Sequence, residues 1–359
     1  MDLSLIALPA VGQVLLPLGL LAWQVAARPA LRQAWFLQSL VVLGYLAGVL
    51  AAGLWLAIPR TIGWLWLALA IALAARGARR IGREPGATSR GLRRAGTSSS
   101  RARVPVSTGL AFALRAVPAV AVIAWIAVAF AGHRPLPGTP LELRLPFGEG
   151  RYLVVNGGSH PLVNAHLATL APLPRYAPWR GQSYGVDFVR VDALGVRARG
   201  LQPQDPQRYA IFATPVLAPC DGEVVRTEDG RPDMPPPQPD PDRTRLAGNH
   251  VILRCDGQRD RANGGTRDGI GGGAREDPAR VEVVLAHLRR GTVRVAAGRR
   301  VAVGEVLGEV GNSGNSNEPH LHLSAQRRDP GDPPLGGEPV PVTFGGDAPV
   351  RNEVYHAYP

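Results

Sequence analysis

The sequence predicts an all-β antiparallel soluble domain preceded by an α-helical membrane region of about four spans. Two observations support this division. Long apolar runs occupy the first 131 residues. From about residue 141, short runs of Val, Ile, Leu and Tyr alternate with clusters of Gly, Pro, Asp and Asn. With 359 residues, the chain has room for the membrane region and one soluble domain of about 200 residues.

The apolar runs define the membrane region, residues 1–131. The first, second and fourth runs are long enough to cross a bilayer core, whereas the third is short. The first run has neither a basic start nor a small-residue cleavage site, so a removable signal peptide is not expected. The four runs are 4–26, 35–58, 62–76 and 107–131.

Positive charge is concentrated in this region and predicts its orientation. Of a net charge of +12, residues 1–131 carry +11, and nine Arg lie between residues 76 and 103. Under the positive-inside rule, the Arg-rich loop at 77–104 is cytoplasmic, and everything after about residue 132 lies outside. A folded or nucleic-acid-binding loop is the alternative, but its Gly, Ser and Arg content is typical of disorder, and no nucleic-acid partner is expected.

The soluble part begins after a Pro- and Gly-containing linker, 132–140. The domain is expected at 141–345, followed by a C-terminal tail, 346–359. Two insertions, 228–248 and 256–279, are expected to be mobile surface loops. The expected strands are Arg151–Asn156, Tyr184–Val191, Gly222–Arg226, His250–Cys255, Val281–Leu288 and His320–Ala325.

Both cysteines of the chain lie in this domain. Cys220 precedes one expected strand and Cys255 ends another, so antiparallel pairing of the two strands would bring the cysteines together. An exported location would permit a disulfide. Two free buried thiols are the alternative.

A Gly-, Asn- and Ser-rich loop from Gly311 leads into His320-Leu321-His322. In a strand, side chains two residues apart point to the same face, about 7 Å apart. One imidazole can then bind a metal while the other acts as an acid or base beside it. The pair alone would favour the simpler interpretation of two surface histidines.

Two residues upstream complete a candidate site. Asp187 lies within the strand-like run Tyr184–Val191, where Asp is unfavourable unless it has a role, and His287 ends the run Val281–Leu288. Glu318 is expected to shape the loop before Pro319.

The stretches Ala213–Val225 and Val295–Gly311 resemble the barrel-sandwich shared by biotinyl and lipoyl carrier domains and by lysostaphin-type peptidases. A carrier domain needs a lysine for its cofactor, and this chain has none. Together with Asp187, His287 and the His-x-His pair, residues 180–326 resemble the lysostaphin/LytM family of zinc metalloendopeptidases, which hydrolyse peptidoglycan.

The resemblance implies roles for these residues. Asp187 and His322 would bind Zn²⁺, and His287 and His320 would be catalytic. The implied enzyme is a metalloendopeptidase that hydrolyses peptide cross-links of peptidoglycan. Its partners would be peptidoglycan and the membrane lipid bilayer, and it would lie in the cytoplasmic membrane as a multi-pass protein with its C-terminal domain extracytoplasmic.

One position departs from the family pattern. The family has a His four residues before the Asp, and here that position is Ser183, a poor zinc ligand. His166 is the first choice to supply the third metal ligand, with His160 and His250 behind it. Weak binding through two ligands is a second explanation. A third is a catalytically inactive domain that binds cell wall or regulates a partner hydrolase.

Overall fold

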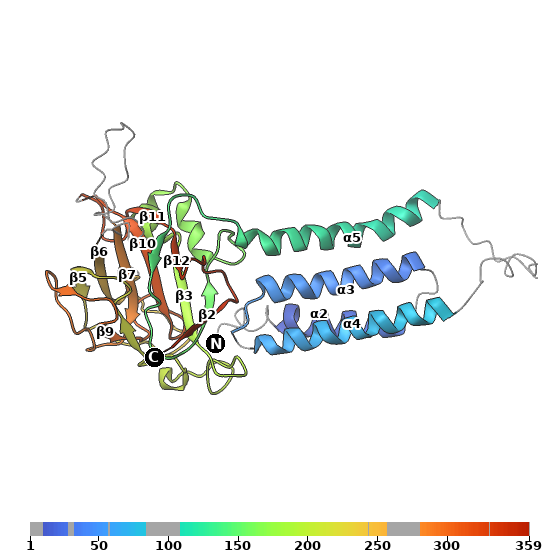
Figure 1. Cartoon of the computed structure of the whole chain (residues 1–359), viewed down its shortest axis with the longest axis horizontal. Helices are drawn as coiled ribbons and strands as arrows, with labels where there is room; N and C mark the ends of the chain where they lie inside the picture. The colour runs from blue at the N-terminus through green and yellow to red at the C-terminus, as the bar shows by residue number, and fades with distance from the viewer. Residues whose placement is uncertain are drawn as a thin grey trace, which may run out of the picture. The chain divides into compact units, whose positions relative to one another are not determined.

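The computed structural model describes residues 10–27, 32–56, 58–83, 108–242, 244–256, 281–329 and 331–358. For residues 83 and 108–116 it describes the backbone only. The chain forms two compact units. A helical unit comprises residues 3–53 and 60–130, and a β unit consists mainly of residues 131–359. Figure 1 shows the helices of the first unit and the strands of the second.

Two glycines on helix α3 (Arg32–Ala52) allow it to pack closely against helix α5 (Thr108–Phe130). Gly44 and Gly48 lie one turn apart; a Cβ at Gly44 would be 2.2 Å from Val122, and one at Gly48 would be 2.0 Å from Trp125. Any larger residue would therefore push the two helices apart. The helices of this unit are η1 (Val11–Leu15, π-helical), α2 (Leu16–Ala26), α3 (Arg32–Ala52), α4 (Arg60–Arg83) and α5 (Thr108–Phe130).

In the described part of the chain, two helices have the length and hydropathy of membrane spans, Arg32–Ala52 and Arg60–Gly82. The prediction of about four spans is therefore not supported. The apolar helix Val11–Ala26 has 16 residues, or about 24 Å at 1.5 Å per residue, against a hydrocarbon core of about 30 Å. Val117–His133 is similarly short, but it is only the part of α5 and the following turn whose side chains are described; the backbone of α5 begins at Thr108.

The expected third run was too short. The sequence pattern ended it at residue 76, whereas α4 continues to Arg83 because Arg and Ala are good helix formers. Residues 77–83, expected at the start of the Arg-rich loop, are therefore helical. The remainder of that loop, 84–104, lies outside the described residues.

The β unit is built on a nine-stranded sheet, and its antiparallel strands confirm the predicted class. Its main path runs β13-β2-β3-β10-β7-β6-β5-β8, with β11 paired to β10. Every pair in it is antiparallel, while the separate pair β1–β12 is parallel. The strands that carry the fold are β2 (Gly150–Asn156), β3 (Val186–Arg190), β5 (Gly222–Glu228), β6 (Asn249–Cys255), β7 (Val281–Leu288), β10 (Leu321–Arg327) and β13 (Val354–Ala357).

One face of this sheet forms the main core. Alternate residues such as Val186, Phe188, Leu321 and Leu323 are buried there. The short antiparallel pair formed by β4 and β9 contributes Val216 and Leu307 to the same core. The remaining short strands are β1 (Leu141–Leu143), β4 (Pro215–Leu217), β8 (Arg300–Val301), β9 (Val306–Glu309), β11 (Glu338–Val340) and β12 (Val342–Phe344).

Two segments that were expected to lie outside the folded domain, as a mobile loop and a tail, are hydrogen-bonded to it. The segment 228–248, expected to be a mobile insertion, is hydrogen-bonded to the loop before β10: the backbone N–H of Met234 donates to Asn312 O, and that of Asn312 donates to Asp233. The expected tail, 346–359, contains β13, which pairs with β2. Most of the other insertion, 257–279, lies outside the described residues.

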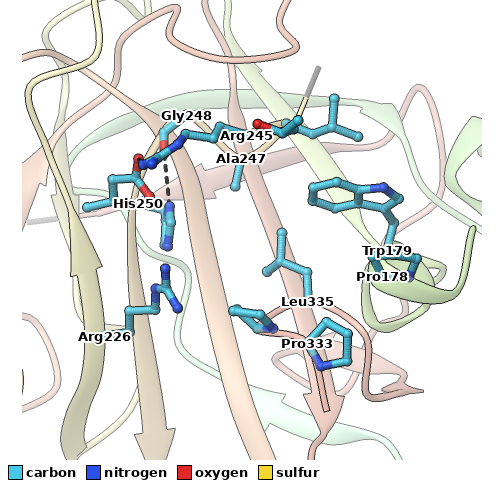
Figure 2. A pocket seen from close by; sticks show the side chains of 13 residues that line it. Pro178, Trp179, Arg226, Arg245, Ala247, Gly248, His250, Pro333 and Leu335 are labelled. Atoms are coloured by element: carbon cyan, nitrogen blue, oxygen red, sulfur yellow. Dashed lines mark hydrogen bonds and ion pairs between the residues drawn. The ribbon is translucent and has the colours of Figure 1, made fainter. Parts of the chain in front are cut away.

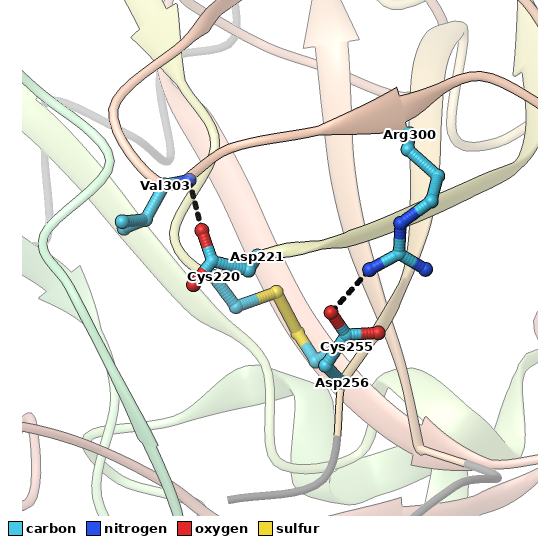
Figure 3. Close-up of a disulfide and its surroundings, with 6 residues drawn as sticks. All are labelled: Cys220, Asp221, Cys255, Asp256, Arg300 and Val303. Carbon is cyan, nitrogen blue, oxygen red and sulfur yellow. Dashed lines mark hydrogen bonds and ion pairs between the residues drawn. A yellow bond between two sulfur atoms is a disulfide. The ribbon is translucent and has the colours of Figure 1, made fainter.

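A disulfide joins Cys220 to Cys255, which decides between the two alternatives for these residues. Cys255 lies opposite Gly222 in the β5–β6 pairing, so the antiparallel ladder brings the two cysteines to the same end. Their Cα atoms are 5.7 Å apart. Figure 3 shows the flanking polar contacts, in which Asp221 accepts a hydrogen bond from the backbone of Val303 and Asp256 pairs with Arg300.

Replacing both cysteines by serine should lower the free energy of unfolding of the β unit by about 4 kcal/mol, because the bond closes a loop with a sequence separation of 35 residues. Denaturant unfolding of the oxidised wild type and the double variant would measure this. Reduced wild type should behave like the variant. Equal stability of oxidised wild type and variant would contradict the expectation.

Candidate active site

The register between β3 and β10 places the first two predicted site residues side by side. Asp187 lies directly opposite His322. Because their neighbours Phe188 and Leu321 point into the main core, both polar side chains point to the other face of the sheet. His322 Nδ1 lies 2.9 Å from Asp187 Oδ1, which is a hydrogen bond between two buried side chains.

His320 immediately precedes β10 and joins this pair. Its Nε2 lies 3.7 Å from Asp187 Oδ1, while its Nδ1 lies 2.8 Å from the carbonyl oxygen of Glu318. The Glu318 carboxylate accepts two hydrogen bonds from the Arg197 guanidinium, at 2.7 and 2.8 Å. The ion pair between Glu318 and Arg197 therefore stabilises the loop before β10.

His287 reaches the site through an unusual backbone conformation. Its φ is +64°, in the left-handed region that costs a non-glycine residue about 1–3 kcal/mol. Its N–H donates to Ala247 O, and its Nδ1 lies 2.8 Å from Ser313 O. The centroid of its ring is 4.7 Å from that of His320 and 6.0 Å from that of His322.

His166 comes from a separate helical turn, η3 (Ala165–Leu170). Asn164 caps this turn: its Oδ1 accepts a hydrogen bond from the backbone N–H of His166 at 3.2 Å and lies 2.9 Å from His166 Nδ1. The other ring nitrogen, Nε2, lies 3.5 Å from Asp187 Oδ2. The structure therefore brings together Asp187, His287, His320, His322 and His166.

Ser183 takes no part in this group. It is fully buried at the end of η4 (Pro174–Gln182), and its hydroxyl donates to Arg180 O at 2.6 Å and lies 2.7 Å from Thr169 Oγ1. Two residues later, Gly185 passes close to the site, where a Cβ would be 2.5 Å from His322 Cε1.

The two alternative histidines lie elsewhere. The ring nitrogen Nδ1 of His160 accepts a hydrogen bond from the backbone of Leu162. His250 lies on β6, and Ala286 of β7 separates it from His322 in the cross-strand register. Neither belongs to the group of possible metal ligands found among the described residues.

Sequence reasoning missed two residues that hold Asp187. Asn156 ends β2 opposite Asp187 and donates from Nδ2 to Asp187 Oδ2 at 2.8 Å. Arg351 donates to Asn156 Oδ1 at 3.0 Å and to two backbone carbonyls, those of Val155 and Leu162. Asn156 could have been singled out as a polar residue ending an apolar strand, but no local signal marks Arg351.

The electrostatics of the group favour an anionic Asp187 and neutral His166 and His287. Burial by itself would raise the pKa of the Asp187 carboxyl, but the nearby imidazoles of His166, His320 and His322 outweigh it and hold that pKa well below its ordinary value. Burial lowers the pKa of His166 to about 4, although Asp187 opposes the shift. Burial, together with the other histidines, also holds the pKa of His287 well below 6.5.

Three of these residues fit a zinc ion. The donor atoms of His166, Asp187 and His322 all lie within 4.8 Å of one another. Tetrahedral zinc with nitrogen and oxygen ligands near 2.0–2.1 Å places adjacent ligand atoms about 3.4 Å apart. The 3.5 Å between His166 Nε2 and Asp187 Oδ2 is close to this value, whereas the 2.9 Å between His322 Nδ1 and Asp187 Oδ1 is shorter because these two atoms are hydrogen-bonded to each other. Two neutral imidazoles and a carboxylate are also a donor set that zinc enzymes use.

Comparison with known protein families finds a match over a short part of the chain. Residues 274–333 match the model described as peptidase family M23. No curated protein matches the chain.

Solved structures with low identity also match. The catalytic domain of the antimicrobial peptidase lysostaphin from Staphylococcus simulans is 20% identical, with 41% of this chain and 68% of that chain covered and a TM-score of 0.22. A mutant catalytic domain of a prophage-encoded M23 protein from Enterococcus faecalis is 17% identical, covering 58% and 93%, with a TM-score of 0.25. A zinc-containing peptidase from Vibrio cholerae is 15% identical, covering 44% and 48%, with a TM-score of 0.22. These TM-scores add nothing to the family match.

The metal-free protein should lose stability as the pH falls from about 6.5 towards 4. Unfolded His166 takes up a proton near pH 6.5, whereas in the folded protein it does so only near pH 4, so the unfolded state binds more protons in this window. Each such histidine contributes up to about 1.4 kcal/mol per pH unit, and His287 acts in the same direction.

Denaturant unfolding in a chelator at pH 7 and pH 5 would measure this slope. The slope measures the number of protons taken up on unfolding. His166→Ala should lower that number by up to one, whereas replacing the exposed His356 by Ala should leave it unchanged. The same free energy of unfolding at both pH values would refute the expectation.

Proposed function

We propose that the β unit is a member of peptidase family M23, whose model matches residues 274–333, and that the protein is a zinc-dependent metalloendopeptidase that hydrolyses peptide cross-links of peptidoglycan. The observation that carries the proposal is the convergence of four histidines on one buried carboxylate, Asp187. Structural histidines are usually satisfied singly by a backbone or solvent partner. A group of this kind at one face of a sheet supports a metal-dependent reaction.

In this proposal, His166, Asp187 and His322 hold the metal. When bound, zinc would lower the pKa of a water molecule towards 7 and polarise the carbonyl group of the scissile peptide bond. Asn156 fixes the orientation of the Asp187 carboxylate through Oδ2, and Asn164 fixes the ring of His166 through Nδ1. Partners of this kind set ligand geometry and metal affinity.

The remaining two histidines are suited to proton transfer. A carbonyl oxygen only accepts, so Nδ1 of His287 carries the proton that it donates to Ser313 O, and Nδ1 of His320 donates likewise to Glu318 O. Each Nε2 is left with a lone pair. We assign His287 and His320 to accepting a proton from the attacking water, stabilising the developing oxyanion and returning the proton to the leaving amine.

The proposed location is the cytoplasmic membrane, with the β unit on its outer side. The apolar helices α3 and α4 support membrane insertion, and α5, with 23 residues, is long enough to return the chain to the outer side. The excess of Arg between residues 76 and 103 supports a cytoplasmic position for that stretch. The disulfide between Cys220 and Cys255 supports an oxidising environment for the β unit.

Purified full-length protein in detergent should contain about one zinc per chain and release muropeptides from peptidoglycan. His166→Ala should lose most of the zinc because it removes one of three ligands. Ser183→Ala should keep the zinc, because Ser183 faces Thr169 and Arg180. Elemental analysis of the variants would measure this, and unchanged zinc in His166→Ala would refute that ligand assignment.

His287→Ala should keep the zinc and lose about 10²-fold or more of the muropeptide release, because a positioned acid or base typically contributes 10²- to 10⁴-fold. His356→Ala is the matched control, since that histidine lies exposed on β13. Full activity in His287→Ala would refute its role. A metal-free wild type without activity would favour a domain that binds cell wall or regulates a partner hydrolase.

Reporter fusions should reveal the orientation. Alkaline phosphatase fused after residue 359 should be active, because it folds only outside the cytoplasm, while green fluorescent protein at the same position should be dark. Fusions after Arg83 should give the opposite pattern, because the end of α4 is expected on the cytoplasmic side. Identical patterns at the two positions would rule out this topology.

A further inference from the structure

A pocket of about 340 Å³ lies on the β unit beside the candidate active site (Figure 2). His250, which lines it, precedes Ile252 by two residues, and Ile252 packs with Ala286 on the face of the sheet that also carries His322. In the cross-strand register, His322 lies opposite Ala286, and Ala286 lies opposite His250. The pocket is therefore two strands from the site, or about 10 Å at the usual strand spacing.

His250 presents an unused acceptor in this pocket. Its side chain is buried, with 6% of the residue exposed, and its Nδ1 lies 2.9 Å from Gly248 O. The carbonyl accepts, so Nδ1 carries the proton and Nε2 carries a lone pair. Nε2 has no hydrogen-bond partner in the described part of the chain. A buried acceptor of this kind is costly unless a ligand supplies a donor.

Arg226 presents an unused cation beside it. Figure 2 shows its guanidinium group next to the ring of His250, and no ion pair to Arg226 is found within the described ranges. Glu228 also lines the pocket and lies opposite His250 in the β5–β6 register, but its carboxylate pairs with Arg245 and Arg231. The Arg226 side chain is exposed and can therefore reach an incoming carboxylate.

The opposite wall of the pocket is apolar. Trp179 packs with Leu335, and Pro178 and Pro333 extend the same surface. The pocket thus combines a cation, a hydrogen-bond acceptor and an apolar wall. An amino-acid residue with a free carboxylate, a backbone N–H and an aliphatic part offers the complementary groups.

We propose that this pocket is a binding subsite for a substrate residue that carries a free carboxylate. Arg226 binds the carboxylate, Nε2 of His250 accepts the N–H of the same residue, and Trp179 and Leu335 contact its aliphatic part. The inference rests on the proposed function, in which the substrate is a peptide. At about 3.3–3.6 Å per extended residue, a span of about 10 Å places the carboxylate about three residues from the bond cleaved.

Binding should be measured separately from catalysis, in the full-length His287→Ala variant, by calorimetry. The probes are a synthetic peptidoglycan stem peptide with free carboxylates and the same peptide with its carboxylates amidated. The acid should bind about fivefold to tenfold more tightly, as expected for an Arg–carboxylate contact. In the same background, Arg226→Gln should abolish this preference. Arg294→Gln is the matched control and should retain the preference, because Arg294 is exposed and lies outside the lining of the pocket.

His250→Phe tests the acceptor while keeping an aromatic ring. It should weaken binding of acid and amide by the same factor, because both probes contain the N–H group. Equal affinity of the two probes for the unchanged pocket, no binding of either, or a preference that survives Arg226→Gln would overturn the proposal. Inactive protein that still prefers the acid would refute the proposed peptidase activity and leave the subsite in place.

Discussion

The candidate site depends on the register between β3 and β10, in which Asp187 lies opposite His322. Side chains alternate between faces, so a shift of one residue in this pairing would move one of the two into the core and separate them. The register is fixed by the buried neighbours, since Val186, Phe188, Leu321 and Leu323 fill the main core on the other side. The same apolar packing that stabilises the sheet therefore determines which polar groups meet.

A buried carboxylate in this position needs compensation from several directions. Asp187 receives a hydrogen bond from Asn156, contacts His322 directly and lies within 4 Å of His166 and His320. These partners come from three separate segments of the β unit, namely β2, η3 and the start of β10. Burial favours the neutral form of His166 and His287, which is the form that can bind a metal or accept a proton. The proposed peptidase chemistry and the stability of the fold thus draw on the same contacts.

Local pattern and resemblance predicted much of this arrangement. The six expected strands all form, and strand alternation places Asp187, His320 and His322 on one side of the sheet. His287 joins them through its left-handed backbone conformation, so its place in the site followed from the resemblance and not from alternation. His166 was predicted only as a replacement for the histidine that the family has at the position of Ser183. Asn156 and Arg351 were missed, since their roles arise from contacts 31 and 195 residues apart in sequence. The number of spans was overestimated because apolar composition does not determine where a helix begins and ends.

Because Arg351 comes late in the sequence, the site can be fully formed only late in synthesis of the chain. It donates to Asn156, which in turn holds Asp187, so the supporting network is complete only when the chain extends past residue 351. Asp187 itself is made more than 160 residues earlier. A partly synthesised or truncated chain can therefore contain all four histidines and Asp187 and still lack Arg351, the cation that is hydrogen-bonded to Asn156. The support of Asp187 through Asn156 is therefore complete only after residue 351 has been made.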